Sequence, residues 1–239
     1  MKILLLAGNT LRARSYAQIL AAQVENNFEV EAIFYGFNKK ECLDIEVDDD
    51  TEHFFKSEKL FIPDLTESIK STFKKIKWKY TDIEETDVNS DVILNELKKF
   101  DGDIIIFAGY GGQILKAKHF EIGKKYLHMH PGRIPMERGS TTIYYSILNK
   151  RRCSVTGFYM SERIDDGINI MIKEYKVPYK NVNIDLWYDN IIRADCFIET
   201  LSKIVNRKEL PENVIESSEE YYVIHPVLKH VALLSLKEN

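Results

Sequence analysis

Cysteine is scarce in this chain of 239 residues. The three cysteines, Cys42, Cys153 and Cys196, lie far apart, and no Cys-x-x-Cys pair occurs. This pattern excludes a disulfide framework and a cysteine-held zinc site, because both need several cysteines at short, repeated spacings. The sequence therefore predicts a protein of the reducing cytoplasm.

A long apolar run and an excess of positive charge are also missing. The apolar stretch from Met1 to Gly8 is too short for a signal peptide, and no stretch approaches the roughly 20 apolar residues of a membrane helix. The formal net charge is -4 at pH 7, whereas proteins that grip a phosphate backbone present a basic face. We expect a soluble intracellular protein whose partners are neither membranes nor nucleic acids.

The dinucleotide fingerprint Gly-x-Gly-x-x-Gly does not follow the first predicted strand, which disfavours NAD. The opening does contain a strand, a helix and a second strand, predicted over residues 2–7, 11–24 and 28–35. Residues 2–7 form a continuous apolar run, typical of a strand buried on both faces of a parallel sheet. The opening therefore predicts an α/β fold with a Rossmann-like, doubly wound, mostly parallel sheet.

The rest of the chain continues this alternation. We expect helices over residues 90–100, 141–149 and 184–205, and strands over residues 103–107, 154–160 and 167–177. A hydrophobic content of 44% in 239 residues is enough for one core of ordinary size. The sequence predicts a main domain over residues 1–205 and a carboxy-terminal extension over residues 206–239 that packs back on the body.

Residues 38–63 interrupt the alternation with charged and turn-forming residues. The acidic run from Asp48 to Asp50 predicts a solvated loop. After it, Asp64 and Glu67 have the spacing of a capping box, which predicts that a short helix begins at Asp64.

Two imidazoles stand two positions apart in the middle of the chain. In an extended segment, side chains two apart project to the same face, so His128 and His130 are expected to point to one side of a strand end. Histidine titrates near neutral pH and serves as an acid-base catalyst or a metal ligand. The segment predicts a reaction centre, although one of the two rings could instead be a hydrogen-bonded core residue.

Two later turns carry polar residues that could complete this centre. Arg138 and Gly139 end a loop before a predicted helix, which leaves backbone N–H groups for an anion. Asp165 and Asp166 precede Gly167 at a turn between strands, where acids are often only turn residues. A carboxylate placed against an imidazole fixes its tautomer and stabilises its protonated form, so an Asp165–His130 pair would favour acid-base chemistry.

Five motifs follow one another in a fixed order between residues 103 and 170. They are Gly109-Tyr110-Gly111-Gly112-Gln113-Ile114-Leu115, His128-Met129-His130-Pro131, Ile134-Pro135-Met136-Glu137-Arg138-Gly139, Ser154-Val155-Thr156 and Asp165-Asp166-Gly167. In this order they resemble the N-terminal catalytic domain of the N10-formyltetrahydrofolate-dependent formyltransferases, the family of glycinamide ribonucleotide, methionyl-tRNA and nucleotide-amino-sugar formyltransferases. One position departs from the family, because His128 stands where the catalytic asparagine is expected.

The resemblance implies that residues 1–205 form a formyltransferase-like catalytic domain. An amine would attack the formyl carbon of the co-substrate N10-formyltetrahydrofolate, and the tetrahedral intermediate would expel tetrahydrofolate. His130 would stabilise the oxygen of the intermediate or relay a proton, Asp165 would orient His130 and accept the proton of the amine, and His128 would donate to the oxyanion. The pterin would lie against the backbone of Gln113, Ile114 and Leu115 and of Arg163, Ile164 and Asp165. We expect Arg138 and Gly139 to bind the acceptor substrate.

Length and charge narrow the acceptor that the resemblance implies. Methionyl-tRNA formyltransferases carry a further C-terminal domain and a basic surface, and glycinamide ribonucleotide formyltransferases usually lack the long segment between Tyr35 and Asp103. We therefore expect a small-molecule acceptor, a nucleotide-linked amino sugar of the kind used in the biosynthesis of bacterial surface polysaccharides. The apolar tail from Tyr221 onward could pack as core or form part of a homodimer surface.

Two other classes of function stay open at this point. A metal-dependent hydrolase would use His128 and His130 as ligands, with Asp165 or His225 completing the site. A non-catalytic protein of the same fold would bind folate or a nucleotide sugar without turnover, and the histidine at position 128 motivates this alternative.

Overall fold

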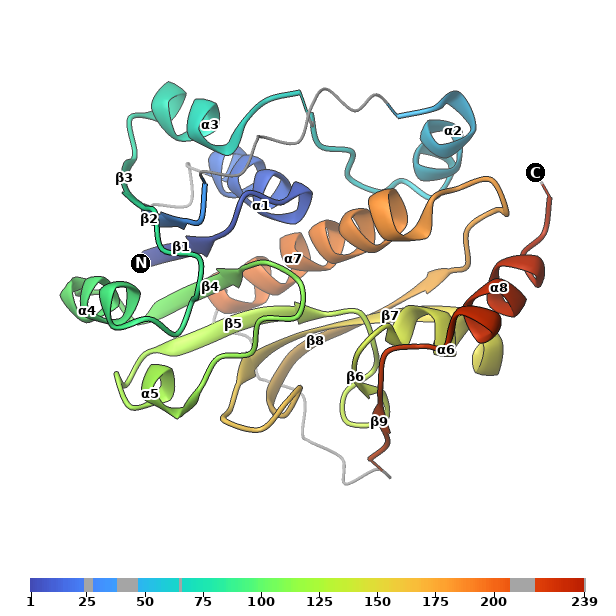
Figure 1. Ribbon diagram of the computed structural model, residues 1–239. Helices are drawn as coiled ribbons and strands as arrows, with labels where there is room; N and C mark the ends of the chain where they lie inside the picture. The colour runs from blue at the N-terminus through green and yellow to red at the C-terminus, as the bar shows by residue number, and fades with distance from the viewer. Residues whose placement is uncertain (24–27, 38–46, 65, 207–217, 239) are drawn as a thin grey trace. The chain divides into compact units, whose positions relative to one another are not determined.

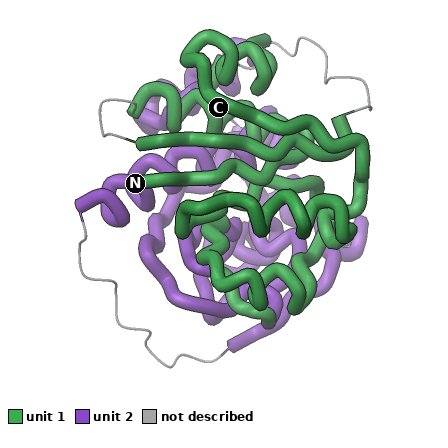
Figure 2. Tube along the Cα trace, turned by 90° about the vertical axis from the view of Figure 1, so that its left-hand side faces the viewer, with its two compact units in different colours: residues 1–46, 63–128, 160–162 green, residues 47–62, 129–159, 163–239 purple. Residues whose placement is uncertain are grey.

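The computed structural model describes residues 1–23, 28–37, 47–64, 66–206 and 218–238. The chain divides into two compact units, which Figure 2 shows in different colours. Unit 1 comprises residues 1–46, 63–128 and 160–162, and unit 2 comprises residues 47–62, 129–159 and 163–239. The boundary predicted between residues 205 and 206 stays a prediction, because it adjoins residues 207–217, which lie outside the described residues.

Seven strands form one sheet in the order β3-β2-β1-β4-β5-β7-β8 (Figure 1). They are β1 (Lys2–Ala7), β2 (Glu29–Tyr35), β3 (Lys79–Ile83), β4 (Ile104–Ala108), β5 (Lys125–His130), β7 (Arg152–Met160) and β8 (Gly167–Lys176). β1 pairs in parallel with β2 and β4, β2 with β3, and β4 with β5. Residues 161–166 alone connect β7 to β8, which is too short for a parallel crossover. The predicted Rossmann-like, doubly wound, mostly parallel sheet is confirmed.

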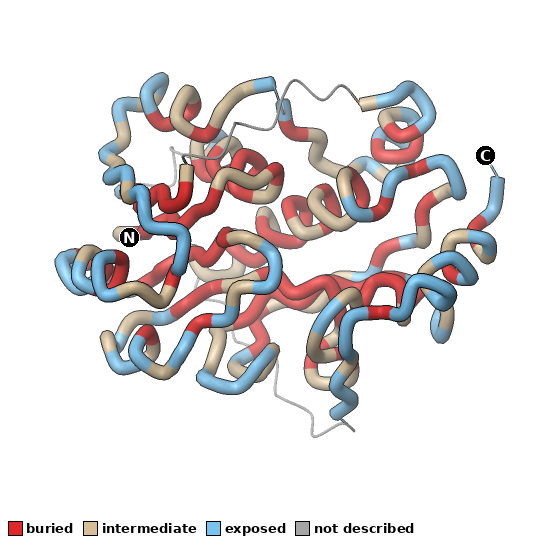
Figure 3. Tube along the Cα trace, in the orientation of Figure 1, coloured by how far each residue is buried: buried red, intermediate tan, exposed pale blue. Residues whose placement is uncertain are grey.

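The core of unit 1 follows from apolar strands and capped helices. β4 is buried along its whole length and β1 along all but its first residue (Figure 3). The helices are α1 (Leu11–Ala22), α3 (Ile69–Ile76), α4 (Asp91–Lys99) and α5 (Ala117–Phe120). Ser90 caps α4 by accepting from the Ile93 N–H, and Ile93 and Leu97 then pack against Leu4 and Ile105 of the sheet.

Unit 2 contains short strands and helices around β7 and β8. The helices are α2 (Asp49–Ser57), α6 (Thr142–Lys150), a π-helical turn η2 (Ile184–Tyr188) that leads into α7 (Asp189–Val205), and α8 (Pro226–Leu234). The two-residue strands β6 (Arg138–Gly139) and β9 (Glu220–Tyr221) pair in parallel, and α8 contacts α6. In the described ranges, no helix combines the length and the apolar composition that crossing a membrane requires.

Two sequence predictions about residues 48–68 are wrong. The acidic run is not a loop, because Asp48 accepts from the Thr51 N–H and starts α2; carboxylates in a first helical turn face the positive end of the helix dipole. The next helix, α3, begins after Ser68 rather than at Asp64. The Asp64 carboxylate instead accepts from Thr66, two residues on, and forms a local turn.

The strand β3 was not predicted. Its sequence, Lys79-Tyr80-Thr81-Asp82-Ile83, has no buried residue and pairs only with β2 at the end of the sheet. Charged side chains are typical of an edge strand, where they oppose pairing with other chains. The hydrophobic pattern that marks a central strand is therefore absent.

Candidate active site

Both ring nitrogens of His130 lie close to an oxygen atom, at the end of β5. Its side chain is buried, with Nε2 2.6 Å from the Glu137 carbonyl oxygen and Nδ1 3.3 Å from Oδ1 of Asp165. A carbonyl only accepts, so Nε2 carries a proton. An ionised carboxylate also only accepts, so a hydrogen bond across the Nδ1–Oδ1 contact requires a proton on one of these two atoms. The two side chains are therefore placed to hold one proton between them.

Asp165 adopts a left-handed backbone conformation. Its φ is 46°, in the left-handed region, and its side chain is 13% exposed. Oδ2 accepts from the backbone N–H of Gly139 at 2.8 Å. Non-glycine residues in this region cost roughly 1–3 kcal/mol and gather at functional sites. Asp166 is different, because its carboxylate accepts from the N–H of Gly167 and stabilises only the turn.

Hydrogen bonds from two threonines fix the loop between His130 and Gly139, and the backbone of Gly132 lies close to that of Glu137. Thr156 accepts from the Ile134 N–H at 3.1 Å and donates to the Gly132 carbonyl at 2.6 Å, and Thr142 donates to the Pro131 carbonyl. A Cβ at Gly132 would stand 2.6 Å from the Glu137 carbonyl oxygen, so this position needs glycine. These contacts place the carbonyl oxygen of Glu137 against His130.

Arg138 and Gly139 form β6, which the carboxy-terminal strand β9 holds from the other side. The Arg138 N–H donates to the Glu219 carbonyl and the Ser140 N–H to the Tyr221 carbonyl. The Nε of Arg138 is buried, and no hydrogen-bond partner for it occurs among the residues that the structure describes. A buried guanidinium nitrogen without a partner costs free energy.

His128 lies in unit 1 and is half-buried. Its Nδ1 is 3.3 Å from the Phe107 carbonyl oxygen, and its ring centroid is 5.8 Å from that of Phe107. In a neutral imidazole this contact assigns the proton to Nδ1, so Nε2 presents a lone pair. A neutral His128 in this orientation accepts a hydrogen bond at Nε2, and only the imidazolium donates there.

The glycine-rich turn after β4 is held by side chains on both sides. Tyr35 donates to Oε1 of Gln113 at 2.6 Å, and Nε2 of Gln113 donates to the Thr86 carbonyl at 2.7 Å. Asn89 donates to the Ile114 carbonyl at 3.0 Å. Leu115 is buried, whereas Ile114 is 55% exposed. The turn follows the point where the strand order reverses between β1 and β4, which is where open α/β sheets bind ligands.

The structure thus brings His130, Asp165 and Gly139 together within unit 2. Arg163 and Ile164 precede Asp165 on the same turn, and both are exposed. His128 and the segment from Gln113 to Leu115 belong to unit 1. Sequence reasoning missed Glu137 and Thr156. A glutamate in a loop is ordinarily solvated, and nothing in the sequence marks this one as buried.

The chain shares sequence similarity with known proteins over about half of its length. No family model matches it. The chain is 31% identical over 124 residues to methionyl-tRNA formyltransferase of Rickettsia prowazekii and 31% identical over 131 residues to that of Listeria welshimeri. These matches cover 50% and 51% of the chain but 40% and 41% of the relatives, so the chain aligns with about two fifths of their length.

Solved structures resemble the chain over most of its length. A sugar N-formyltransferase from a Shewanella species has a TM-score of 0.62 at 15% identity, covering 98% of the chain and 87% of that structure. An N-formyltransferase from Helicobacter canadensis, in complex with folinic acid and dTDP-3-aminofucose, has a TM-score of 0.55 at 20% identity, covering 93% and 71%. The chain resembles formyltransferases in sequence over about half of its length and in fold over most of it. At these identities the solved structures establish the formyltransferase fold.

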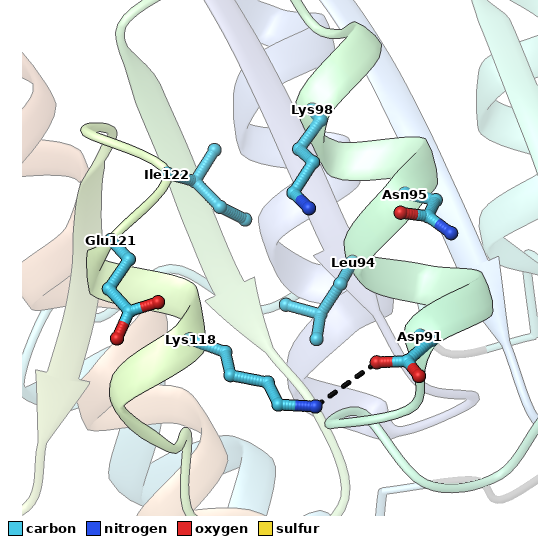
Figure 4. Close-up of a pocket in the computed structure, with 7 residues that line it drawn as sticks. All are labelled: Asp91, Leu94, Asn95, Lys98, Lys118, Glu121 and Ile122. Atoms are coloured by element: carbon cyan, nitrogen blue, oxygen red, sulfur yellow. Dashed lines mark hydrogen bonds and ion pairs between the residues drawn. The ribbon is translucent and has the colours of Figure 1, made fainter.

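A hollow of about 400 Å³ lies elsewhere in unit 1. It runs between α4 and the segment around α5, and Figure 4 shows Lys118 reaching Asp91 across it at 3.1 Å. Leu94 and Ile122 also line it, and none of the predicted site residues does. Its rim is made of solvated charges, so we assign it no part in the site.

Metal ligation was the basis of one alternative function. Within the part of the chain that the structure describes, no group of three or more His, Cys, Asp and Glu side chains is arranged to hold a metal ion. His225, expected as a third ligand in that alternative, caps α8 by accepting from the Val227 N–H at Nδ1.

Proposed function

We propose that this chain transfers a formyl group from N10-formyltetrahydrofolate to a primary amine of a nucleotide-linked amino sugar. The observation that carries the proposal is the buried His130–Asp165 pair, 3.3 Å apart, with the Gly139 N–H on the second carboxylate oxygen. Transfer of a formyl group from one nitrogen to another requires one group that takes a proton from the amine and returns it to the leaving nitrogen. A pair that holds one proton between two fixed atoms suits this requirement.

The residues expected to bind the donor combine exposed apolar side chains with backbone polar groups, which suits a flat heteroaromatic ring. Ile114 and Ile164 expose 55% and 41% of their surface, and each stands in a turn with backbone polar groups. Exposed apolar side chains beside backbone donors and acceptors can bind a pterin by its face and by its edge. Folinic acid, a formyl folate, is bound by the Helicobacter canadensis relative, which supports a folate donor here. As the resemblance implies, we propose that Gln113, Ile114 and Leu115 and also Arg163, Ile164 and Asp165 bind the donor.

The residues would divide the chemistry as follows. As the amine attacks the formyl carbon, the Asp165 carboxylate accepts the proton that the amine nitrogen loses. His130 keeps that carboxylate oriented through Nδ1, because its Nε2 proton is held by the Glu137 carbonyl oxygen. His128 donates to the formyl oxygen from its imidazolium form. Asp165 then returns the proton to N10 as the bond from N10 to the formyl carbon breaks. Holding amine and donor together supplies much of the acceleration.

We infer the acceptor from the net charge of the chain and from the buried Nε of Arg138, for which the described residues provide no hydrogen-bond partner. The buried Nε of Arg138 suits a phosphate or carboxylate oxygen, and nucleotide-linked sugars carry phosphates. The net charge of -4 does not favour a tRNA. The sugar N-formyltransferase from Shewanella and the complex with dTDP-3-aminofucose support an amino-sugar acceptor.

Calorimetric binding of folinic acid to metal-free protein tests the proposal without a choice of acceptor. We expect micromolar binding that is lost in Asp165→Ala, followed by formylation of one member of a panel of nucleotide amino sugars, detected by mass spectrometry. Absence of binding would contradict the proposal of a folate donor and would favour the alternative of a metal-dependent hydrolase. Tight binding without turnover across the panel points to a non-catalytic folate-binding protein.

A further inference from the structure

Glu137 is a buried carboxylate for which the proposed chemistry has no use. The residue is 3% exposed, and its side chain is 4% exposed. Oε2 accepts from the backbone N–H of Arg133 at 2.9 Å, and Oε1 accepts from the Ser146 hydroxyl at 2.9 Å and lies 3.2 Å from Nζ of Lys150. Three donors around one carboxylate compensate for its burial.

These donors close the turn that follows His130 and attach it to a helix. The N–H of Glu137 donates to the Arg133 carbonyl at 2.8 Å, while its carboxylate accepts from the N–H of the same Arg133. Both the carbonyl and the N–H of Arg133 are therefore bonded to Glu137, and these two bonds close the turn. Ser146 and Lys150 are four residues apart, so they lie on one face of α6 and hold the carboxylate from that side.

The backbone of the same residue faces the catalytic ring. The Glu137 carbonyl oxygen lies 2.6 Å from Nε2 of His130, and this contact is what directs Nδ1 toward Asp165. A shift of the turn by a fraction of an ångström would break this hydrogen bond. The ring would then be able to exchange the proton between its two nitrogens or to rotate.

We propose that Glu137 is a positioning residue, whose carboxylate holds the turn so that its carbonyl oxygen keeps His130 protonated at Nε2 with Nδ1 on Asp165. This inference rests on the proposed function for its catalytic meaning. The position and tautomer of the ring, however, can be measured without any substrate.

The test is a long-range proton–nitrogen NMR spectrum of protein labelled with nitrogen-15 in its six histidines, with His130→Gln used to assign the His130 signals. The wild-type protein is expected to show a slowly exchanging Nε2 proton on His130. In Glu137→Gln the amide places N–H groups against existing donors, so the turn opens. We expect this proton to exchange at least tenfold faster and the ring to show mixed tautomers. In the transfer assay, kcat should fall at least tenfold while KM for the donor stays within about twofold.

Glu174→Gln is the matched control, because Glu174 is a half-exposed carboxylate that pairs with the guanidinium of the same Arg133 at 3.7 Å but not with its backbone. Its His130 signals should match those of the wild type. If Glu137→Gln does not fold, Ser146→Ala removes one of the three donors and should shift the same signals in part. Unchanged His130 signals in a folded Glu137→Gln variant would overturn the positioning role. Altered signals in a protein that shows no formyl transfer would leave the positioning role standing and contradict the proposed function.

Discussion

The backbone N–H of Gly139 donates to Oδ2 of Asp165 at 2.8 Å, so a residue without a side chain orients the carboxylate that faces His130. Gly139 has a φ of +100°, and a Cβ at this position would stand 2.1 Å from the Tyr221 carbonyl oxygen. The turn can therefore contain no residue other than glycine without moving β9.

Replacement of Gly139 by alanine should destabilise the protein. We expect Gly139→Ala to lower the free energy of unfolding by about 2–4 kcal/mol, because it combines backbone strain with loss of the β6–β9 hydrogen bonds. Urea unfolding measures this change. The control is Gly111→Ala, where a Cβ would meet nothing within 4 Å, and where we expect a change below about 0.5 kcal/mol. Equal effects at the two glycines would refute the argument from close approach.

The carboxylate of Asp165 should be needed for transfer, whereas that of its neighbour should not. Asp165→Asn keeps the size of the side chain but removes the group that shares a proton with Nδ1 of His130. We expect kcat to fall roughly 100-fold or more, as is typical when an acid-base group is lost. Asp166→Asn is the matched control, since Asp166 only accepts from the Gly167 N–H. A similar loss of kcat in both variants would show that transfer depends on the structure of the turn and not on proton transfer by Asp165.

Replacement of His128 by asparagine tests the donor role of this side chain. Nδ1 of His128 lies 3.3 Å from the Phe107 carbonyl oxygen, and a neutral ring that donates there has no second N–H. Asparagine supplies an amide donor, so we expect His128→Asn to raise kcat about tenfold. Formyl transfer by the two proteins under the same conditions provides the test. A rate that falls in the variant would assign His128 a role other than donor.

His119 should make stability depend on pH, away from the site. The ring is fully buried, its Nε2 donates to the Val88 carbonyl at 3.1 Å and its Nδ1 accepts from the Tyr126 hydroxyl at 3.1 Å, so it is neutral. Burial lowers the pKa of His119 from 6.5 to about 4. The unfolded chain therefore binds one more proton than the folded protein between these values, and the free energy of unfolding falls as the pH falls through this range.

The size of this effect is about 3 kcal/mol between pH 7 and pH 4. It is measured as the difference between wild type and His119→Gln, because a neutral amide cannot take up the proton while the other groups titrate equally. Unfolding in urea at a series of pH values gives both curves. Parallel curves for the two proteins would show that His119 does not contribute.

The sequence was informative where one segment determines its own structure. The run from Asp103 to Phe107 could only be a buried central strand, and Ser90 identifies the start of α4 because a serine before an apolar face is a helix cap. The motif order placed His130 and Asp165 in one site, and the structure puts them 3.3 Å apart. Their catalytic roles stay predictions.

Other features depend on partners that the sequence does not reveal. Glu137 is buried only because Arg133, Ser146 and Lys150 converge on it, and Ser146 and Lys150 lie on a helix that begins five residues further on. The acidic run at Asp48 was misread because consecutive carboxylates suit both a solvated loop and the first turn of a helix. Charge alone does not distinguish these two cases, since the difference lies in the hydrogen bond to Thr51.

The pairing of β6 with β9 also has a consequence for the order in which the protein is made. Thr141 accepts from the Ile224 N–H, although the two residues are 83 positions apart. A nascent chain on the ribosome can form His130 and its turn long before residue 224 has emerged. The loop that contains Arg138 and Gly139 gains its hydrogen bonds to residues 219–224 only when that later segment is free to fold. Synthesis of residues 131–141 is therefore not enough to complete the loop, and a chain released before Tyr221 would lack these hydrogen bonds.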